Sequence, residues 1–414
     1  MFSFRTTPID EQEDIVLKGG KLGIICNQTA WHPEWGEYLF EHISKYYNLK
    51  RVFTPEHGLF GELQDQVKLD ITTEYNNLNL YNKESGEPVE FVSLYGNSED
   101  SLAATVDKLK DLDAIIIELQ DVGCRYYTYQ STILNLFKVL KKYDLDLPIY
   151  IIDRINPAGR QIEGTMLRAG YRSFIGIEGI INRHGLTIGE LSYYLYEELH
   201  AKFPLHIISY KASQISKDFM PWSIPPSPNF PGLFTAHFYS GQCLWEGTNV
   251  SEGRGTTRPF EIFGAPYLEE LIKFNKNNNY SSWNDKSNPI YDEGVYIRWL
   301  KFIPVFHKYA NECCYGFQLH LNPNIQYHAL AHNLKIIRFL HDNCEKFEFR
   351  PGKYEAGNDK TAIELLLGDK ELIDYVNGIG DWADIKEHIK VEEQKWIRKA
   401  KKALLYEEQL FRIK

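Results

Sequence analysis

Residues 52–58 read VFTPEHG. The apolar start of this stretch predicts a short buried strand, which stops at Pro55 and then presents Glu56 and His57 before a glycine turn. Four other segments of the N-terminal half have the same form, an apolar run that ends in polar, turn-forming residues: 24–29, 92–96, 115–123 and 149–154. The carboxyl ends of parallel strands meet at one edge of an α/β sheet, and ligands bind there. We therefore expect Glu56 and His57 at such an edge, facing the residues that end the other strands.

The first half of the chain alternates strand-like runs with segments of helical apolar spacing. Strands are expected at residues 21–26, 49–54, 90–94, 114–119, 148–152 and 205–209. Helices are expected at residues 31–47, 101–109, 128–143 and 187–199. This alternation predicts an α/β fold in which right-handed crossovers connect a parallel sheet.

A chain of 414 residues is longer than one ordinary hydrophobic core requires, which indicates two domains. Residues 221–231 hold five prolines, a composition typical of an extended connector. We therefore expect an α/β domain at residues 1–220 and a smaller domain at residues 221–414. The second domain mixes expected strands with expected helices, which predicts an α+β unit. These strands are at residues 295–302 and 315–321, and the helices are at residues 327–341, 361–367 and 391–406.

The composition excludes several classes of protein. A net charge of -10 argues against nucleic-acid binding, because neutralising phosphates needs a basic surface. No apolar run is long enough to span a bilayer, and the first 20 residues contain early acids without an apolar core, so we expect a cytoplasmic protein. The six cysteines form no CxxC pair and are interpreted as buried free thiols. The sequence is compatible with a homodimer and does not fix the oligomeric state.

Glu56 is the first candidate for chemistry. A carboxylate that follows a buried strand and a proline is partly removed from water, which raises its pKa toward the range of a general acid. The alternative interpretation is structural, with Glu56 capping a helix and His57 holding the turn. The position at a strand end favours function.

The segment DVGCRYYTY, residues 121–129, follows the most apolar strand. Asp121 is a candidate catalytic carboxylate. Arg125 offers a planar fork that suits a carboxylate or phosphate, and Tyr127 and Tyr129 add hydroxyls and flat faces of the kind that hold sugars. The alternative is that Arg125 pairs with Asp121 while the tyrosines are core residues.

Further candidate binding residues occupy the other predicted loops. They are Asp153, Arg154 and Asn156 after the strand at 148–152, His184 before the helix at 187–199, Asn229 in the proline-rich connector, and Glu246, Glu252 and Arg254 in a glycine-rich stretch. Thr187 and Glu190 have the spacing of a capping box. Arginines that gather in the loops of an acidic protein indicate an anionic ligand.

Metal and cofactor chemistry find less support in the sequence. Glu56, His57, Asp121, Asp153 and His184 are possible hard ligands, but no HxH or HExxH spacing accompanies them. No GxGxxG follows the first strand, and the loop at 246–258 lacks the Gly-Lys-Ser/Thr ending of a nucleotide-binding loop. We therefore expect neither a metal nor a cofactor.

Six motifs in order together resemble the family long described as domain of unknown function 1343. They are TPEHG (54–58), LQDVGCRYYTY (119–129), DRINPAGR (153–160), RHGLTIGEL (183–191), PPSPNFP (225–231) and LWEGTNVSEGRGTTRPFEIFGAP (244–266). The similarity runs in register to Pro266 and more loosely to the C-terminus. Characterised members are exo-β-N-acetylmuramidases, which release terminal N-acetylmuramic acid from the non-reducing end of peptidoglycan fragments.

The resemblance implies a Rossmann-like domain and a smaller domain, with the active site in the cleft between them. It implies a hydrolase of cell-wall turnover and recycling, a muramyl sugar as the binding partner, and Glu56 as the catalytic residue. The second catalytic group is left open between Asp121, Asp153, a carboxylate at 246–252 and the acetamido group of the sugar itself. Two alternatives are a muramyl-sugar binding protein without catalysis and a metal-dependent hydrolase of another anionic sugar.

Overall fold

A computed structural model describes residues 17–33, 35–64, 75–96, 102–208, 224–272, 283–355 and 358–406. Within these residues the N-terminal half forms a six-stranded parallel sheet with the order β10-β7-β6-β1-β4-β5. Its strands are β1 (Leu22–Cys26), β4 (Leu49–Thr54), β5 (Glu90–Ser93), β6 (Ala114–Glu118), β7 (Ile149–Ile152) and β10 (Leu205–Ile208). Counted along the chain, the order is 3-2-1-4-5-6, the doubly wound order of Rossmann folds. The predicted α/β class is therefore confirmed.

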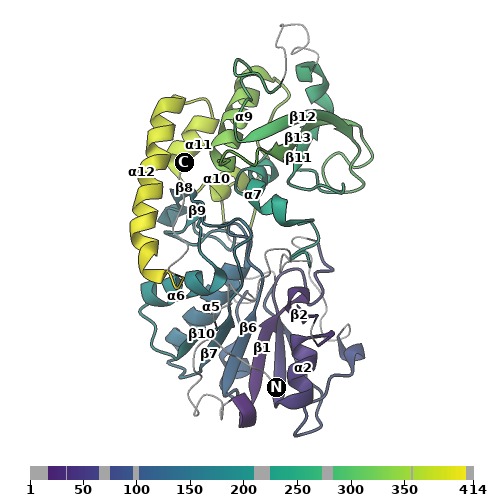
Figure 1. Cartoon of the computed structure of the whole chain (residues 1–414), viewed down its shortest axis with the longest axis vertical. Coiled ribbons are helices and arrows are strands. Elements are labelled where there is room, and N and C mark those ends of the chain that lie inside the picture. Colours follow the sequence, from purple (N-terminus) through teal and green to yellow (C-terminus); the bar gives the residue numbers. More distant parts are fainter. Residues whose placement is uncertain are drawn as a thin grey trace.

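Helices cover both faces of this sheet. Successive residues of a strand point to opposite faces, so a strand buried on both sides must be apolar throughout. In β6, Ile115 and Ile117 pack in one core with α5 (Tyr129–Lys142), whereas Ile116 packs in the other core with α2 (Leu39–Tyr46). Figure 1 shows the sheet in the lower part of the molecule, with α2 and α5 on opposite sides of it.

The helix expected at residues 31–47 begins later than predicted. β2 (Trp31–His32) and β3 (Glu37–Tyr38) form a small antiparallel pair, and Gly36 between them has a φ of 66°. Only glycine adopts this left-handed backbone without strain. The turn interrupts an apolar spacing that looks helical in the sequence, and α2 begins only after β3.

Two other helices test the predicted starts. α6 (Ile188–Glu198) begins with the predicted capping box: the Glu190 N–H donates to Thr187 Oγ1 at 3.1 Å, and the Thr187 N–H donates to Glu190 Oε2 at 3.0 Å. The helix expected at 101–109 is reduced to α4 (Val106–Leu109), and residue 101 lies outside the described residues.

The C-terminal half carries an antiparallel sheet with the order β11-β13-β12. Its strands are β11 (Ile262–Ala265), β12 (Val295–Phe302) and β13 (Cys314–Leu321), and the helices around it are α7 (Leu233–Gln242), α9 (Ala329–Asn343), α10 (Ala362–Leu367), α11 (Lys370–Val376) and α12 (Trp382–Ala400). The predicted smaller α+β unit is present. β11 and α11 are additional elements, and α12 begins before the expected residue 391.

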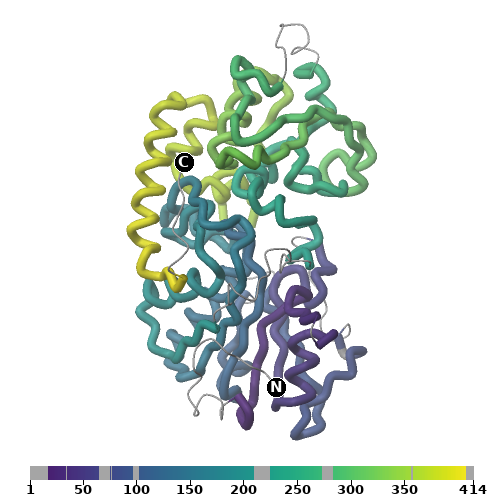
Figure 2. The backbone as a smooth tube through the Cα atoms, viewed as in Figure 1, coloured from purple at the N-terminus to yellow at the C-terminus, as the bar shows by residue number. Residues whose placement is uncertain are grey.

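The two halves interlock. An unpredicted hairpin, β8 (Glu163–Met166) with β9 (Ile181–Arg183), leaves the first half after β7 and packs against α12 and α9 of the second. In return, Trp396 of α12 packs beside Leu191 of α6. Figure 2 shows α12, in yellow, running from the upper part down to the first-half helices. The boundary proposed near residue 220 stays a prediction.

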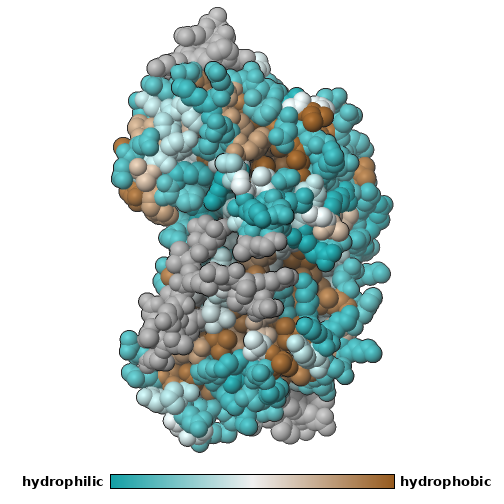
Figure 3. All heavy atoms as spheres, turned by 180° about the vertical axis from the view of Figure 1, so that it is seen from behind, coloured by the Kyte–Doolittle hydropathy of each residue, from teal (hydrophilic) through white to brown (hydrophobic). Residues whose placement is uncertain are grey.

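The surface is largely hydrophilic when seen from behind, with apolar patches on both the upper and the lower part (Figure 3). Among the described residues, no helix combines the length and the apolar character that crossing a membrane requires.

The hairpin is held by a buried carboxylate. Glu163 is 0% exposed, and its Oε1 accepts from Arg183 Nη1 at 2.6 Å. Its Oε2 accepts from Ser240 Oγ of α7 at 2.7 Å and from the Leu330 N–H of α9 at 3.1 Å. Burial alone would raise the pKa of Glu163, but the charges of Arg183 and His328 hold it below its usual value. One ionised side chain therefore joins three elements that are distant in sequence.

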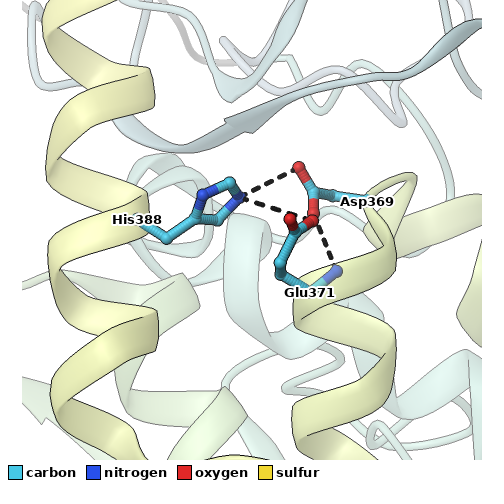
Figure 4. Close-up of side chains that lie close together, drawn as sticks. All are labelled: Asp369, Glu371 and His388. Carbon is cyan, nitrogen blue, oxygen red and sulfur yellow. Dashed lines mark hydrogen bonds and ion pairs between the residues drawn. The ribbon is translucent and has the colours of Figure 1, made fainter.

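A second ion-pair cluster joins α12 to α11. His388 Nε2 lies 3.1 Å from Asp369 Oδ2 and 4.0 Å from Glu371 Oε2, as Figure 4 shows. Arg168, after β8, approaches the same Asp369 Oδ2 with Nη2 at 3.0 Å, and its Nη2 lies 3.2 Å from Glu392 Oε2. The cluster fixes the last long helix against the hairpin.

Replacing Glu163 by Gln tests the hairpin carboxylate. The change leaves the buried Arg183 guanidinium without its counter-charge, and breaking a buried pair in this way costs about 3–5 kcal/mol. We expect the midpoint of urea unfolding to fall accordingly. Glu197→Gln, on the exposed side of α6, is the matched control and should change stability by less than about 0.5 kcal/mol. Equal midpoints for the two variants would contradict the role of Glu163.

His388→Gln tests the second cluster through its pH dependence. The hydrogen bond to Asp369 raises the pKa of His388 above its usual value. A group with a raised folded-state pKa stabilises the fold fully below its unfolded pKa, about 6.5, and the stabilisation is lost as the pH rises through the folded pKa. We expect the loss of thermal midpoint in His388→Gln to be larger at about pH 5.5 than at about pH 9. His200→Asn, at an exposed histidine with left-handed backbone, should give no such trend. A pH-independent loss would exclude the charged pair.

Candidate active site

Glu56 lies where β4 ends at the carboxyl edge of the sheet. Its side chain is 7% exposed, and its Oε2 accepts a hydrogen bond from Thr128 Oγ1 at 2.6 Å. Thr128 directly precedes α5, so the carboxylate is fixed against the start of that helix. Glu56 is thus a buried carboxylate at the edge where the sequence places it.

His57 holds the turn that follows Glu56. Its backbone has a φ of 74°, a left-handed conformation rare for residues other than glycine, and Gly58 continues the turn with a φ of 85°. The half-buried ring donates from Nδ1 to the Leu63 carbonyl at 2.9 Å. In the neutral ring this leaves Nε2 as an acceptor.

Asp121 and His184 are brought together from separate loops. Asp121 is 3% exposed, and its Oδ2 accepts from the Gly123 N–H at 2.7 Å and lies 3.3 Å from His184 Nε2. His184 Nδ1 accepts from the Leu186 N–H at 3.1 Å, so the neutral ring carries its proton on Nε2, toward Asp121. The pair fixes the glycine turn that leads to α5.

Tyr129 is a buried residue at the start of α5. Burial raises the pKa of its hydroxyl, and the charges of Glu56 and Asp121 raise it further. That hydroxyl accepts from Asn27 Nδ2 at 2.7 Å and donates to the Pro226 carbonyl at 2.6 Å. It therefore links the end of β1 to the proline-rich connector. Tyr127 is 5% exposed and packs edge-to-face against Tyr129, with ring centroids 4.9 Å apart.

Arg125 has the contacts of a structural residue. It is 0% exposed, and its Nη1 donates to the carbonyls of Thr165 and Ile180 at 2.9 and 3.0 Å. Its Nη2 donates to the carbonyls of Leu366 and Leu367, at the end of α10, at 2.8 and 3.0 Å. The alternative pairing with Asp121 is not among these contacts. Because the side chain is fully buried, it also presents no surface to a substrate. We leave Arg125 out of the proposed site.

Asp153 also has a structural place. Its carboxylate accepts from Thr187 Oγ1 at 2.7 Å, from the Gly189 N–H at 2.8 Å and from the Tyr406 hydroxyl at 2.6 Å. It thus anchors the start of α6. Burial raises the pKa of Asp153 to about 6. Asn156 similarly accepts from the Ala158 N–H at 2.9 Å and shapes the following turn.

The carboxylates of the glycine-rich loop bind side chains of the loop and of neighbouring segments. Glu246 accepts from Arg254 Nη2 at 2.7 Å and from the Tyr354 hydroxyl at 2.7 Å. Glu252 is 0% exposed and accepts from Lys308 Nζ at 2.9 Å. Asn229 instead donates to Gln64 Oε1 at 2.6 Å, which joins the connector to the segment after the PEHG turn.

The loop arginines of the predicted cationic cluster have partners within the protein, and their binding of an anionic ligand stays a prediction. Arg154 Nη1 lies 3.1 Å from Glu118 Oε1, and Arg183, Arg254 and Arg258 have the acceptors Glu163, Glu246 and Glu261. Arg154 and Arg183 pair with buried carboxylates 36 and 20 residues away, and the partners of Arg254 and Arg258 lie 8 and 3 residues away. Loop position alone therefore does not distinguish a binding arginine from a structural one.

Sequence reasoning missed several residues at this edge. Glu118 ends the apolar strand β6; its Oε2 lies 3.0 Å from His32 Nε2, and the residue is 2% exposed. Thr128 and Asn27 lie in segments that the sequence analysis describes, but nothing in the pattern marks them as partners of Glu56 and Tyr129.

Among the described residues, one cluster has side chains close enough together to hold a metal ion. It consists of Asp369, Glu371 and His388, whose potential ligand atoms lie within 4.8 Å of one another. Arg168 already occupies Asp369 Oδ2 through Nε at 3.2 Å and Nη2 at 3.0 Å. A divalent ion would have to compete with this guanidinium, so the residues fit an ion-pair cluster rather than a metal.

Comparison with known proteins places the chain. Residues 22–233 match the family model for the N-terminal part of exo-beta-N-acetylmuramidase NamZ, and residues 237–406 match the model for its C-terminal part. The chain is 33% identical over 363 residues to the peptidoglycan beta-N-acetylmuramidase NamZ of Bacillus subtilis, covering 84% of this chain and 81% of that protein.

Solved structures support the fold. A crystal structure of a DUF1343 family protein from Bacteroides fragilis has a TM-score of 0.72 at 24% identity, covering 96% of this chain and 97% of that one. A second DUF1343 protein from the same organism has a TM-score of 0.64 at 26% identity, covering 95% and 97%. Together with the two family models, which span most of the chain, these findings establish that it belongs to the NamZ family of exo-β-N-acetylmuramidases.

Proposed function

We propose that this chain is a glycoside hydrolase that releases terminal N-acetylmuramic acid from the non-reducing end of peptidoglycan fragments. Family membership and the B. subtilis relative support this reaction. The observation that carries it is the Glu56 carboxylate, which is buried at the carboxyl edge of the sheet and bound by Thr128 at 2.6 Å.

In the proposed reaction Glu56 is the general acid. Hydrolysis of a glycoside needs a proton on the leaving oxygen, and a positioned carboxylic acid supplies it as the bond between C1 and that oxygen breaks. The Thr128 hydroxyl donates to Oε2 and so fixes the orientation of the carboxyl group.

The neighbours of Glu56 have supporting roles. Nε2 of His57 is an acceptor for a sugar hydroxyl, since Nδ1 is committed to the Leu63 carbonyl. Asp121 is a positioning residue, because it binds the Gly123 N–H and faces His184. Its turn leads to Tyr129, whose hydroxyl is bound by Asn27 and the Pro226 carbonyl. Recycling of cell-wall fragments, a cytoplasmic location and a homodimer stay predictions.

Glu56→Gln tests the assignment. The variant keeps the size of the side chain and loses the proton, so kcat on a muramyl–glucosamine disaccharide should fall by about 100-fold or more. A nitrophenyl muramide needs less protonation of its leaving group, and the loss on this substrate should be markedly smaller. Product release is measured by chromatography for the first substrate and by absorbance for the second.

Glu87→Gln is the matched control. It changes an exposed residue in the segment before β5 and should behave as wild type. Near-normal turnover of the disaccharide by Glu56→Gln, with an unchanged thermal midpoint, would refute the assignment of Glu56. Failure of the wild type to release N-acetylmuramic acid from the disaccharide would refute the proposed function itself.

A further inference from the structure

Glu355, in the second half of the chain, binds the segment that connects β8 and β9. Glu355 is partly exposed. It follows Tyr354, whose hydroxyl donates to Glu246. Its Oε2 accepts from the Phe174 N–H at 3.0 Å and its Oε1 accepts from the Ile175 N–H at 3.1 Å. Each carboxylate oxygen has a second lone pair, so both can still accept a proton or a water hydrogen.

Glu355 and Glu56 are tied to the same turn of helix. Thr128 binds Glu56, and three residues later Ser131 Oγ donates to the Phe174 carbonyl at 2.6 Å. Side chains three residues apart on a helix are neighbours, with Cβ atoms about 5–6 Å apart. The amide of that same Phe174 binds Glu355. The start of α5 therefore holds the two carboxylates on adjacent supports, one from each half of the chain.

The electrostatics agree with this placement. Burial raises the pKa of Glu355 despite its two backbone hydrogen bonds, and the negative charge of Glu56 raises it further. A carboxylate with increased proton affinity suits a general base better than a nucleophile, which has to leave again as an anion.

The other carboxylates considered for the second role are engaged elsewhere. Asp153 anchors the start of α6, and Glu252 is bound by Lys308. Glu246 is bound by Arg254. Asp121 faces His184 and the Gly123 N–H.

We propose that Glu355 is the second catalytic carboxylate of the site, a general base that activates the water attacking C1 of the terminal sugar. This inference rests on the proposed function. A proton of the water passes to Glu355 as the water oxygen bonds to C1. The bond from C1 to the leaving oxygen breaks, and that oxygen takes the proton of Glu56. One water is consumed and two hydroxyl groups result. Proton exchange with solvent then returns Glu56 to its acid and Glu355 to its carboxylate.

Two variants separate this role from a purely structural one. Glu355→Gln keeps an acceptor for the backbone amides and loses the base, so kcat should fall by about 100-fold or more on both the disaccharide and the nitrophenyl muramide. This differs from Glu56→Gln, for which the activated substrate is largely spared. Glu355→Ala leaves space for a small anion, and added azide should restore release of nitrophenol and yield the α-glycosyl azide.

The wild-type enzyme supplies the third measurement. Attack of water on the face opposite the leaving group inverts C1, so proton NMR during the first turnovers should detect the α-anomer of N-acetylmuramic acid. Asp359→Asn, an exposed acid of the same segment, is the control and should keep wild-type turnover.

These measurements decide whether Glu355 is the general base. Loss on both substrates, rescue by azide and an α-anomer support the base. Glu355→Gln with more than about half of wild-type kcat, or a β-anomer as first product, overturns it, and so does a loss that azide fails to rescue in a folded Glu355→Ala. If the wild type still releases N-acetylmuramic acid in those cases, the proposed function stands and only the role of Glu355 falls.

Discussion

The buried carboxylate of Glu163 is the interaction on which the two-part architecture depends. An ionised group is tolerated at 0% exposure only if every lone pair finds a donor. Here the donors come from Arg183 in the hairpin, Ser240 in α7 and Leu330 in α9. The three elements must be in place together for the charge to be neutralised. Burial of one carboxylate thereby fixes the hairpin of the first half against α7 and α9 of the second.

Arg125 illustrates why the site was harder to predict than the fold. The sequence correctly locates a guanidinium after a buried strand, but the carbonyls it binds at Leu366 and Leu367 lie 241 and 242 residues further along the chain. No local pattern encodes such partners. The internal partners of the loop arginines therefore could not be predicted from the sequence. The place of Glu56 at the sheet edge could be predicted, because it depends on a strand and a turn, which are local features.

The fold was more predictable for the same reason. β1 and residues 114–117 of β6 are continuous apolar runs, as is typical of strands buried on both faces, and β4 has the apolar pair Val52 and Phe53 near its end. The hairpin of β8 and β9 has no such signal, because its buried residues Glu163 and Arg183 are polar and become compatible with burial only by pairing with each other. α12 begins at Trp382, where Asp381 caps the helix, and its many charges hide the apolar side that packs on α6.

The end of β1 differs from the corresponding turn of dinucleotide-binding Rossmann folds. In dinucleotide-binding folds, glycines after the first strand let a pyrophosphate approach the start of a helix. Here β1 leads into a short 3-10 turn, Gln28–Ala30, whose residues are buried. Asn27 closes that turn by accepting from the Thr29 N–H at 3.1 Å and donates to Tyr129 at 2.7 Å. This turn takes the place of the glycine-rich turn of dinucleotide-binding folds, and Glu56, the proposed catalytic acid, follows the neighbouring strand β4.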